Sequence, residues 1–133
     1  MATERLSIAA TPRTPEIHFD FAAGRLAMCG ESYPDDVATL FGPVVAALRE
    51  HLAEPGTAPL HLDIELVYFN SSSAKVLMNI FQMLEETARQ GRPVTVDWHY
   101  EAEDEAMREF GEDFSEDLEH VAFNLREAAG GGP

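Results

Sequence analysis

The stretch that decides the fold is Leu66-Val67-Tyr68-Phe69-Asn70-Ser71-Ser72-Ser73-Ala74-Lys75, where an apolar segment gives way to a polar turn and then to a helix. Ahead of the turn, residues 60–69 alternate between apolar and polar side chains, which predicts a strand with one face exposed to water. Beyond it, apolar residues recur every three or four positions as far as Ala88, which predicts an amphipathic helix that begins near Ala74. A strand that leads directly into such a helix is typical of an α/β domain.

The segments on either side continue this alternation. Residues 17–30 are expected to form a hairpin, and residues 35–54 a helix. Further along, we expect a strand over residues 93–100, an acidic amphipathic helix within residues 101–119, and a short last strand or extended segment over residues 121–125. Strand–helix–strand order favours parallel pairing, whereas the hairpin must be antiparallel. The expected fold is α/β: a mixed sheet of about five strands, with helices mainly on one face.

The length of 133 residues suits one domain with a substantial core. Residues 1–14 lack periodicity and precede Pro15, so we expect a flexible N-terminal lead-in. Residues 15–127 form the predicted single domain. The glycine-rich residues 128–133 are predicted to be a flexible tail.

The composition restricts the possible partners. Nine Lys and Arg against 24 Asp and Glu give a net charge of -15. Nucleic acid and anionic membranes are therefore disfavoured, because a phosphate-rich partner requires a basic surface. A protein partner with basic patches fits better.

No cofactor or metal is expected from the sequence. The single Cys29 cannot form an internal disulfide, and no paired Cys and His spacing indicates a zinc site. His61, Asp63 and Glu65 share a strand face, but such alternation is usual for a half-exposed strand. No secretion signal or membrane span is recognisable, so the cytoplasm is the expected location.

The serine run has three possible roles. Asn and Ser are preferred helix caps, although one of them would suffice. A catalytic serine would need a nearby base and an orienting acid; His61 and His99 lie on predicted solvent faces, and the Gly-x-Ser-x-Gly motif is absent. A phosphorylated serine at a helix N-terminus is the third role. A separate alternative is a structural adaptor that binds through the acidic segment from Glu101 to Asp117.

A strand followed by Asn-Ser-Ser-Ser and an amphipathic helix resembles the architecture of STAS-type anti-sigma-factor antagonists such as SpoIIAA. In that group an Asp-Ser-Ser-Gly turn carries the phosphoserine, whereas here Asn70 replaces the aspartate and Ser73 the glycine. A closer resemblance, over roughly residues 15–127, is to the SiaC family of small acidic phosphoproteins. It is carried by three blocks: Gly30-Glu31-Ser32-Tyr33-Pro34-Asp35, Tyr68-Phe69-Asn70-Ser71-Ser72-Ser73-Ala74-Lys75 and Gly91-Arg92-Pro93-Val94-Thr95-Val96-Asp97-Trp98-His99-Tyr100.

The SiaC resemblance implies a partner switch without enzymatic activity of its own. The family's phosphoacceptor is a threonine after the asparagine of the central block, a position that Ser71 holds here. The implied partners are a histidine-kinase-like serine kinase, a PP2C-type phosphatase and a diguanylate cyclase that the unphosphorylated form activates, which links the chain to cyclic di-GMP and biofilm regulation. Asn70 is expected to shape the turn, and Ser72, Ser73 and Lys75 to line the partner surface. Ser72 is also a candidate helix cap.

Overall fold

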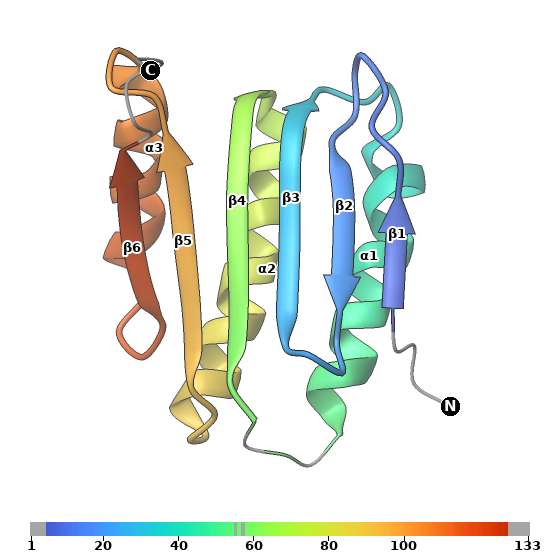
Figure 1. Cartoon of the computed structure of the whole chain (residues 1–133), viewed down its shortest axis with the longest axis vertical. Coiled ribbons are helices and arrows are strands. Elements are labelled where there is room, and N and C mark those ends of the chain that lie inside the picture. Colours follow the sequence, from blue (N-terminus) through green and yellow to red (C-terminus); the bar gives the residue numbers. More distant parts are fainter. Residues whose placement is uncertain (1–4, 55, 57, 128–133) are drawn as a thin grey trace.

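The six strands of the sheet lie side by side in chain order, from β1 at one edge to β6 at the other (Figure 1). The computed structural model describes residues 5–54, 56 and 58–127. The elements are β1 (Arg5–Ile8), β2 (Glu16–Asp20), β3 (Arg25–Ser32), α1 (Val37–Ala53), β4 (Leu60–Phe69), α2 (Ser71–Arg89), β5 (Val94–Tyr100), α3 (Glu105–Glu116) and β6 (Ala122–Glu127).

The pairing of the strands confirms the expected mixed sheet. β2 pairs antiparallel with β3, as the hairpin prediction required. From β3 to β6 every pairing is parallel, because a helix connects each strand to the next. The sheet has six strands where about five were expected.

The additional strand is β1, which pairs antiparallel with β2 and places Leu6 opposite Phe19 and Ile8 opposite Ile17. The prediction of a flexible lead-in over residues 1–14 is therefore wrong for Arg5–Ile8. A strand of four residues shows too few alternations to be recognised, and its partner strand supplies the register. The predicted flexible tail, residues 128–133, lies outside the described residues.

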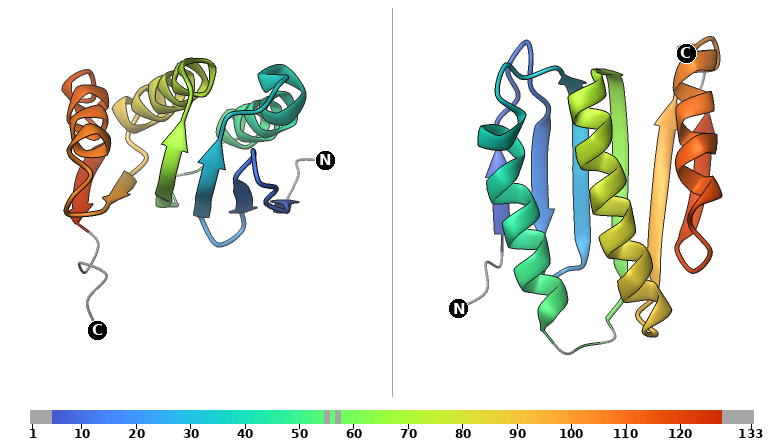
Figure 2. Two further views of the ribbon diagram at one scale, coloured as in Figure 1. Left: turned by 90° about the horizontal axis from the view of Figure 1, so that it is seen from above. Right: turned by 180° about the vertical axis from the view of Figure 1, so that it is seen from behind.

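In the described part of the chain, the three helices pack on one face of the sheet and no helix covers the other face (Figure 2). On the covered face, alternate strand residues such as Leu62, Ile64 and Val96 are buried against the helices. On the open face lie their polar neighbours, including His61 and Asp63, which confirms the prediction of one wet side. Within the described part of the chain, no helix is long and apolar enough to cross a membrane.

Trp98 anchors α3 to the sheet. Its indole has no exposed surface, and its Nε1 donates a hydrogen bond of 2.9 Å to the carbonyl oxygen of Met107. A Cβ added at Gly111 would lie 2.6 Å from Trp98 Cδ1, so only glycine lets the helix backbone approach the ring this closely. Phe114 and Phe123 pack on the same indole, with ring centroids 5.4 and 6.2 Å away. The acidic helix is therefore a fixed part of the core.

A buried carboxylate fixes the connection between α3 and β6. Glu85, on α2, is 6% exposed, and its Oε1 accepts the backbone N–H groups of His120 and Val121 at 2.8 and 3.1 Å. Its Oε2 lies 2.7 Å from His120 Nδ1. Burial alone raises the pKa of Glu85, but these hydrogen bonds and the charge of His120 outweigh it and lower the pKa to about 2. The ionised carboxylate is thus a structural group.

We predict that Glu85→Gln destabilises the fold by about 1–3 kcal/mol, because the amide cannot accept both backbone N–H groups and the histidine as a carboxylate does. The folded pKa of about 2 lies below the ordinary 4.5, so this stabilisation is fully present above pH 4.5 and disappears as the pH falls towards 2. Urea unfolding of both proteins between pH 7 and pH 2 measures it. The difference between wild type and variant should shrink with acid.

Glu86→Gln is the matched control, since Glu86 is exposed and its carboxylate pairs with Arg89 at the surface. Its effect should stay within about 0.5 kcal/mol. A Glu85→Gln protein as stable as wild type at pH 7 would contradict the structural role of this carboxylate.

Candidate functional site

The serine run lies at the carboxyl edge of the parallel strands, where β4 ends at Phe69 and α2 begins at Ser71. Asn70 has extended backbone angles, and its side-chain oxygen accepts the N–H of Ser73 at 2.9 Å. Asn70 is thus the N-cap, as expected of a residue that shapes this turn, and the alternative cap Ser72 is wrong. The helix starts three residues earlier than expected because the capping asparagine stands before all three serines.

Ser73 faces the interior. It has no exposed surface, and its hydroxyl lies 2.8 Å from the hydroxyl of Ser32 and donates to the Ser32 carbonyl at 3.0 Å. The same carbonyl accepts the N–H of Asn70 at 3.0 Å. Ser73 therefore ties α2 to the last residue of β3, and the prediction that it lines a partner surface is wrong. The residue three positions after the cap points back towards the sheet. Because the three serines are identical, the sequence could not show which of them is buried.

The predicted phosphoacceptor and the other two residues of the predicted partner surface face solvent. Ser71, Ser72 and Lys75 are exposed. Within the described residues, neither Ser71 nor Ser72 makes a side-chain hydrogen bond, and no carboxylate lies within 4.0 Å of the Lys75 amine. The first backbone N–H groups of an α-helix also have no partner inside the helix. The turn therefore presents free hydroxyls, free N–H groups and one cation.

Apolar side chains that sequence reasoning did not single out border this turn. Val67 and Tyr68 on β4 are 55% and 51% exposed, and Met78 on α2 is 48% exposed. Phe110, 43% exposed, has its ring centroid 4.9 Å from that of Phe69, next to the cap. Exposed large apolar groups around a polar turn are typical of a protein-binding surface. Their exposure is the signal, and it is visible only once the neighbouring elements are placed.

The first block of the family resemblance, residues 30–35, packs beside the end of β4. The ring of Tyr33 packs at 5.6 Å from that of Tyr68, and its hydroxyl donates to the Pro12 carbonyl at 3.0 Å. Arg13, in the segment before β2, forms an ion pair of 2.6 Å with Asp35. These contacts hold the loop ahead of α1 against the end of β4, through Tyr68, and against the segment between β1 and β2, through Pro12 and Arg13.

The structure brings no histidine to the serines. His61 and His99 lie on the open face of the sheet, where they contact Asp63 at 3.4 and 3.1 Å. Among the described residues, neither is hydrogen-bonded to Ser71 or Ser72. Within the part of the chain that the structure describes, the triad that a serine hydrolase would need is not assembled at this turn.

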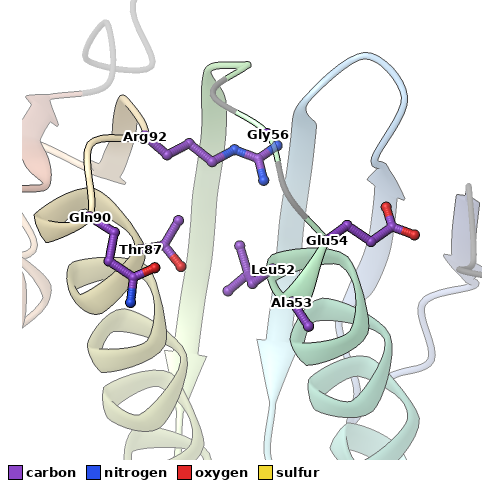
Figure 3. Close-up of a pocket in the computed structure, with 7 residues that line it drawn as sticks. All are labelled: Leu52, Ala53, Glu54, Gly56, Thr87, Gln90 and Arg92. Carbon is purple, nitrogen blue, oxygen red and sulfur yellow. The ribbon is translucent and has the colours of Figure 1, made fainter.

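A hollow of about 190 Å³ lies between the C-terminal ends of α1 and α2, at the far end of α2 from Ser71. Figure 3 shows Leu52 and Thr87 reaching into it from the two helices. The buried Arg92 borders it, but Arg92 Nε donates to the Ala58 carbonyl at 2.6 Å and Nη2 lies 3.0 Å from His51. Helix C-terminal ends repel anions, so the hollow is a poor anion site.

The model of the SiaC family of regulatory phosphoproteins matches residues 8–128. The chain belongs to this family. It is 46% identical, over 112 residues, to an uncharacterized protein of Pseudomonas aeruginosa strain UCBPP-PA14, with 84% of this chain and 88% of that protein covered. The family resemblance read from the three sequence blocks is thereby confirmed.

Solved structures give the same result. The crystal structure of apo-SiaC from Pseudomonas aeruginosa is 42% identical in sequence and superposes with a TM-score of 0.86, covering 93% of this chain and 99% of the other. A chain in the crystal structure of diguanylate cyclase SiaD in complex with its activator SiaC, from the same organism, is 43% identical with a TM-score of 0.87. This match covers 92% of this chain and 98% of that one. The α/β fold and its regulatory class are therefore shown.

Asn70→Ala should reduce the free energy of unfolding by about 0.5–2 kcal/mol, because the N–H of Ser73 loses its acceptor. Asn70→Asp keeps an acceptor oxygen and should change it by less than about 0.5 kcal/mol. Ser72→Ala, at an exposed position, should be neutral. Urea denaturation of the four proteins measures all three effects. Equal losses for Asn70→Ala and Asn70→Asp would show that the cap is not the cause.

Proposed function

We propose that this SiaC-family chain is a partner switch controlled by phosphorylation of Ser71, and that its unphosphorylated form binds and activates a diguanylate cyclase. The observation that supports the proposal is the turn itself. Of its three hydroxyls, that of Ser73 is buried in a hydrogen bond with Ser32. Those of Ser71 and Ser72 are exposed and accessible to a kinase.

Two considerations favour Ser71 over Ser72. Ser71 directly follows the capping asparagine, the position of the family's phosphoacceptor. Residues four apart lie on the same side of a helix, so Ser71 shares its side with the exposed Lys75, whereas Ser72 shares its side with the half-buried Val76. A phosphate on Ser71 therefore has an ammonium group within the same helical stripe.

The turn favours the phosphorylated state electrostatically without requiring a new fold. A phosphoserine carries about -1.5 to -2 charges. At a helix N-terminus an anion is stabilised by about 0.3–1 kcal/mol, and by up to about 2 kcal/mol if partly buried. Because the Ser73–Ser32 bond lies beneath the surface and is untouched, the modification changes the charge and bulk of the surface and leaves the fold in place.

The surface next to Ser71 suits a protein partner. On α2, Ser71, Lys75 and Met78 occupy successive turns of one side, and Phe110 of α3 stands against Phe69 at the base of the turn. A partner that packs against these apolar groups would desolvate Ser71. A dianion at that position would then have to be desolvated too, on a chain whose net charge is already -15. Differential binding of about 1.4 kcal/mol is enough to change affinity tenfold.

The diguanylate cyclase is proposed as the partner because a SiaC chain of this fold is seen with the cyclase SiaD as its activator. We further propose a histidine-kinase-like serine kinase and a PP2C-type phosphatase as the enzymes that add and remove the phosphate, no catalytic activity in the chain itself, and a cytoplasmic site of action. Among the described residues, no histidine is hydrogen-bonded to Ser71 or Ser72, which supports the non-catalytic role.

Incubation with the cognate kinase and ATP should add one phosphate, and fragment mass spectrometry should place it on Ser71. Ser71→Ala should abolish it, whereas Ser72→Ala should leave it. Ser73 should remain unmodified because it is buried. Phosphate confined to Ser72, or found only elsewhere in the chain, would overturn the assignment of Ser71.

Stoichiometric phosphorylation should weaken binding to the cognate diguanylate cyclase at least tenfold and remove its activation, as measured by calorimetry and cyclic di-GMP synthesis. Ser71→Asp should show a smaller loss because one carboxylate carries less charge, and Ser71→Ala should bind as the unmodified protein does. Undiminished binding of the phosphorylated chain would contradict the charge mechanism.

The same binding assay distinguishes the partner switch from the alternative, an adaptor that binds through its acidic helix. Glu109 and Asp113 are exposed on α3. Reversing both charges, as Glu109→Lys with Asp113→Lys, should weaken binding more than phosphorylation does if the acidic helix is the main binding element. The partner switch predicts the opposite order.

A further inference from the structure

A cluster of nitrogen and carboxylate ligands lies on the open face of the sheet, away from the helices and the serine turn. His61 and Asp63 stand two residues apart on β4, and Asp97 lies opposite Asp63 on the neighbouring β5. Figure 1 looks onto this face, with β4 and β5 side by side in front of the helices. His61 Nε2 is 2.8 Å from Asp97 Oδ2 and 3.4 Å from Asp63 Oδ1, and each of the three residues offers one ligand atom within 4.8 Å of the other two.

These separations are those of ligands around one small cation. Zinc is bound by histidine nitrogen and carboxylate oxygen at about 2.0–2.2 Å, so two neighbouring ligands of a tetrahedral site lie about 3.3–3.5 Å apart. The 3.4 Å contact of His61 with Asp63 already has this value, whereas the 2.8 Å contact with Asp97 is a direct ion pair that a small side-chain rotation would have to open. We propose that His61, Asp63 and Asp97 form a binding site for a divalent first-row transition metal ion, with Zn²⁺ as its representative.

The surroundings hold the ligands in place. Asp97 is 7% exposed, and its second oxygen, Oδ1, accepts Asn124 Nδ2 at 3.0 Å and Arg126 Nε at 3.2 Å. Oδ2 is thereby left facing His61. His99 Nε2 lies 3.1 Å from Asp63 Oδ1 and restrains the second carboxylate. Neighbours of this kind orient the ligands in metal sites.

The donor set also selects the class of metal. Imidazole suits zinc, copper and nickel, whereas magnesium prefers six oxygen ligands in near-octahedral geometry. Three protein ligands leave a coordination position for water, and the His61 and Asp63 side chains are 35% and 41% exposed. An ion can therefore reach the site from solvent.

The sequence alone predicted no metal site here. It placed His61, Asp63 and Glu65 on one strand face, and such a row of polar residues is usual for any half-exposed strand. The third ligand is instead Asp97, across the β4–β5 pairing. The competing account is a polar network in which a protonated His61 bridges two carboxylates. Metal binding separates these accounts.

Calorimetric titration of the tag-free, chelator-treated protein with ZnCl₂ should give saturable binding of one equivalent. His61→Gln and Asp63→Asn should each weaken that binding at least tenfold, and circular dichroism should confirm that both variants remain folded. His18→Gln is the control, since His18 is exposed on β2 and hydrogen-bonded to Ser7, outside the cluster.

The melting temperature gives a second readout. Zn²⁺ should raise it in the wild type and in His18→Gln but not in His61→Gln, and a large excess of Mg²⁺ should not displace Zn²⁺. Absence of saturable Zn²⁺ binding would overturn the proposal, and so would an equal loss in His18→Gln and His61→Gln. Neither outcome bears on phosphorylation of Ser71.

Discussion

The position of the serine turn depends on one buried contact, the hydroxyl pair of Ser32 and Ser73. It joins the last residue of β3 to the first turn of α2, and the Ser32 carbonyl also accepts the N–H of Asn70. A buried hydroxyl without a partner would be costly, so the Ser32 hydroxyl requires Ser73, whose own hydroxyl also donates to the Ser32 carbonyl. Because β3 and α2 are fixed to each other here, Ser71 projects from a rigid corner.

This constraint explains why three consecutive serines are not redundant. A cap requires one acceptor, which Asn70 supplies, and the helical turn then sends the next side chains in different directions. Ser73 turns inward, while Ser71 and Ser72 turn outward. The run therefore combines a structural hydroxyl with exposed ones, and the exposed ones can be modified without loss of the structural bond.

Much of the fold follows from periodicity in the sequence. The strand β4 and the helix α2 are long enough to show alternation and helical spacing, and the open face was predicted from the polar positions of β4. The edge strand β1, with four residues, and the inward turn of Ser73 were not predicted. Both depend on partners distant in sequence, Phe19 and Ile17 for the strand and Ser32 for the serine.

The candidate site shows the same limit. The serine turn was found because all its residues are consecutive, whereas the exposed apolar groups beside it come from β4, α2 and α3 and meet only in the folded chain. The SiaC-like blocks were recognisable for the same local reason. Tyr33 and Tyr68 belong to two of them, and the contact between their rings shows that these two blocks meet at this edge of the sheet.

The sheet has an apolar face covered by helices and a polar open face, because successive side chains along each strand point to opposite sides. On β5, Trp98 carries α3 on the covered face, while its neighbours Asp97 and His99 lie on the open one. The exposed stripe of α2 that begins at Ser71 belongs to the helix layer, so a charge added there is separated from the open face by the apolar core. The proposed phosphorylation site in the helix layer and the proposed metal site on the open face are therefore two separate surfaces of the domain.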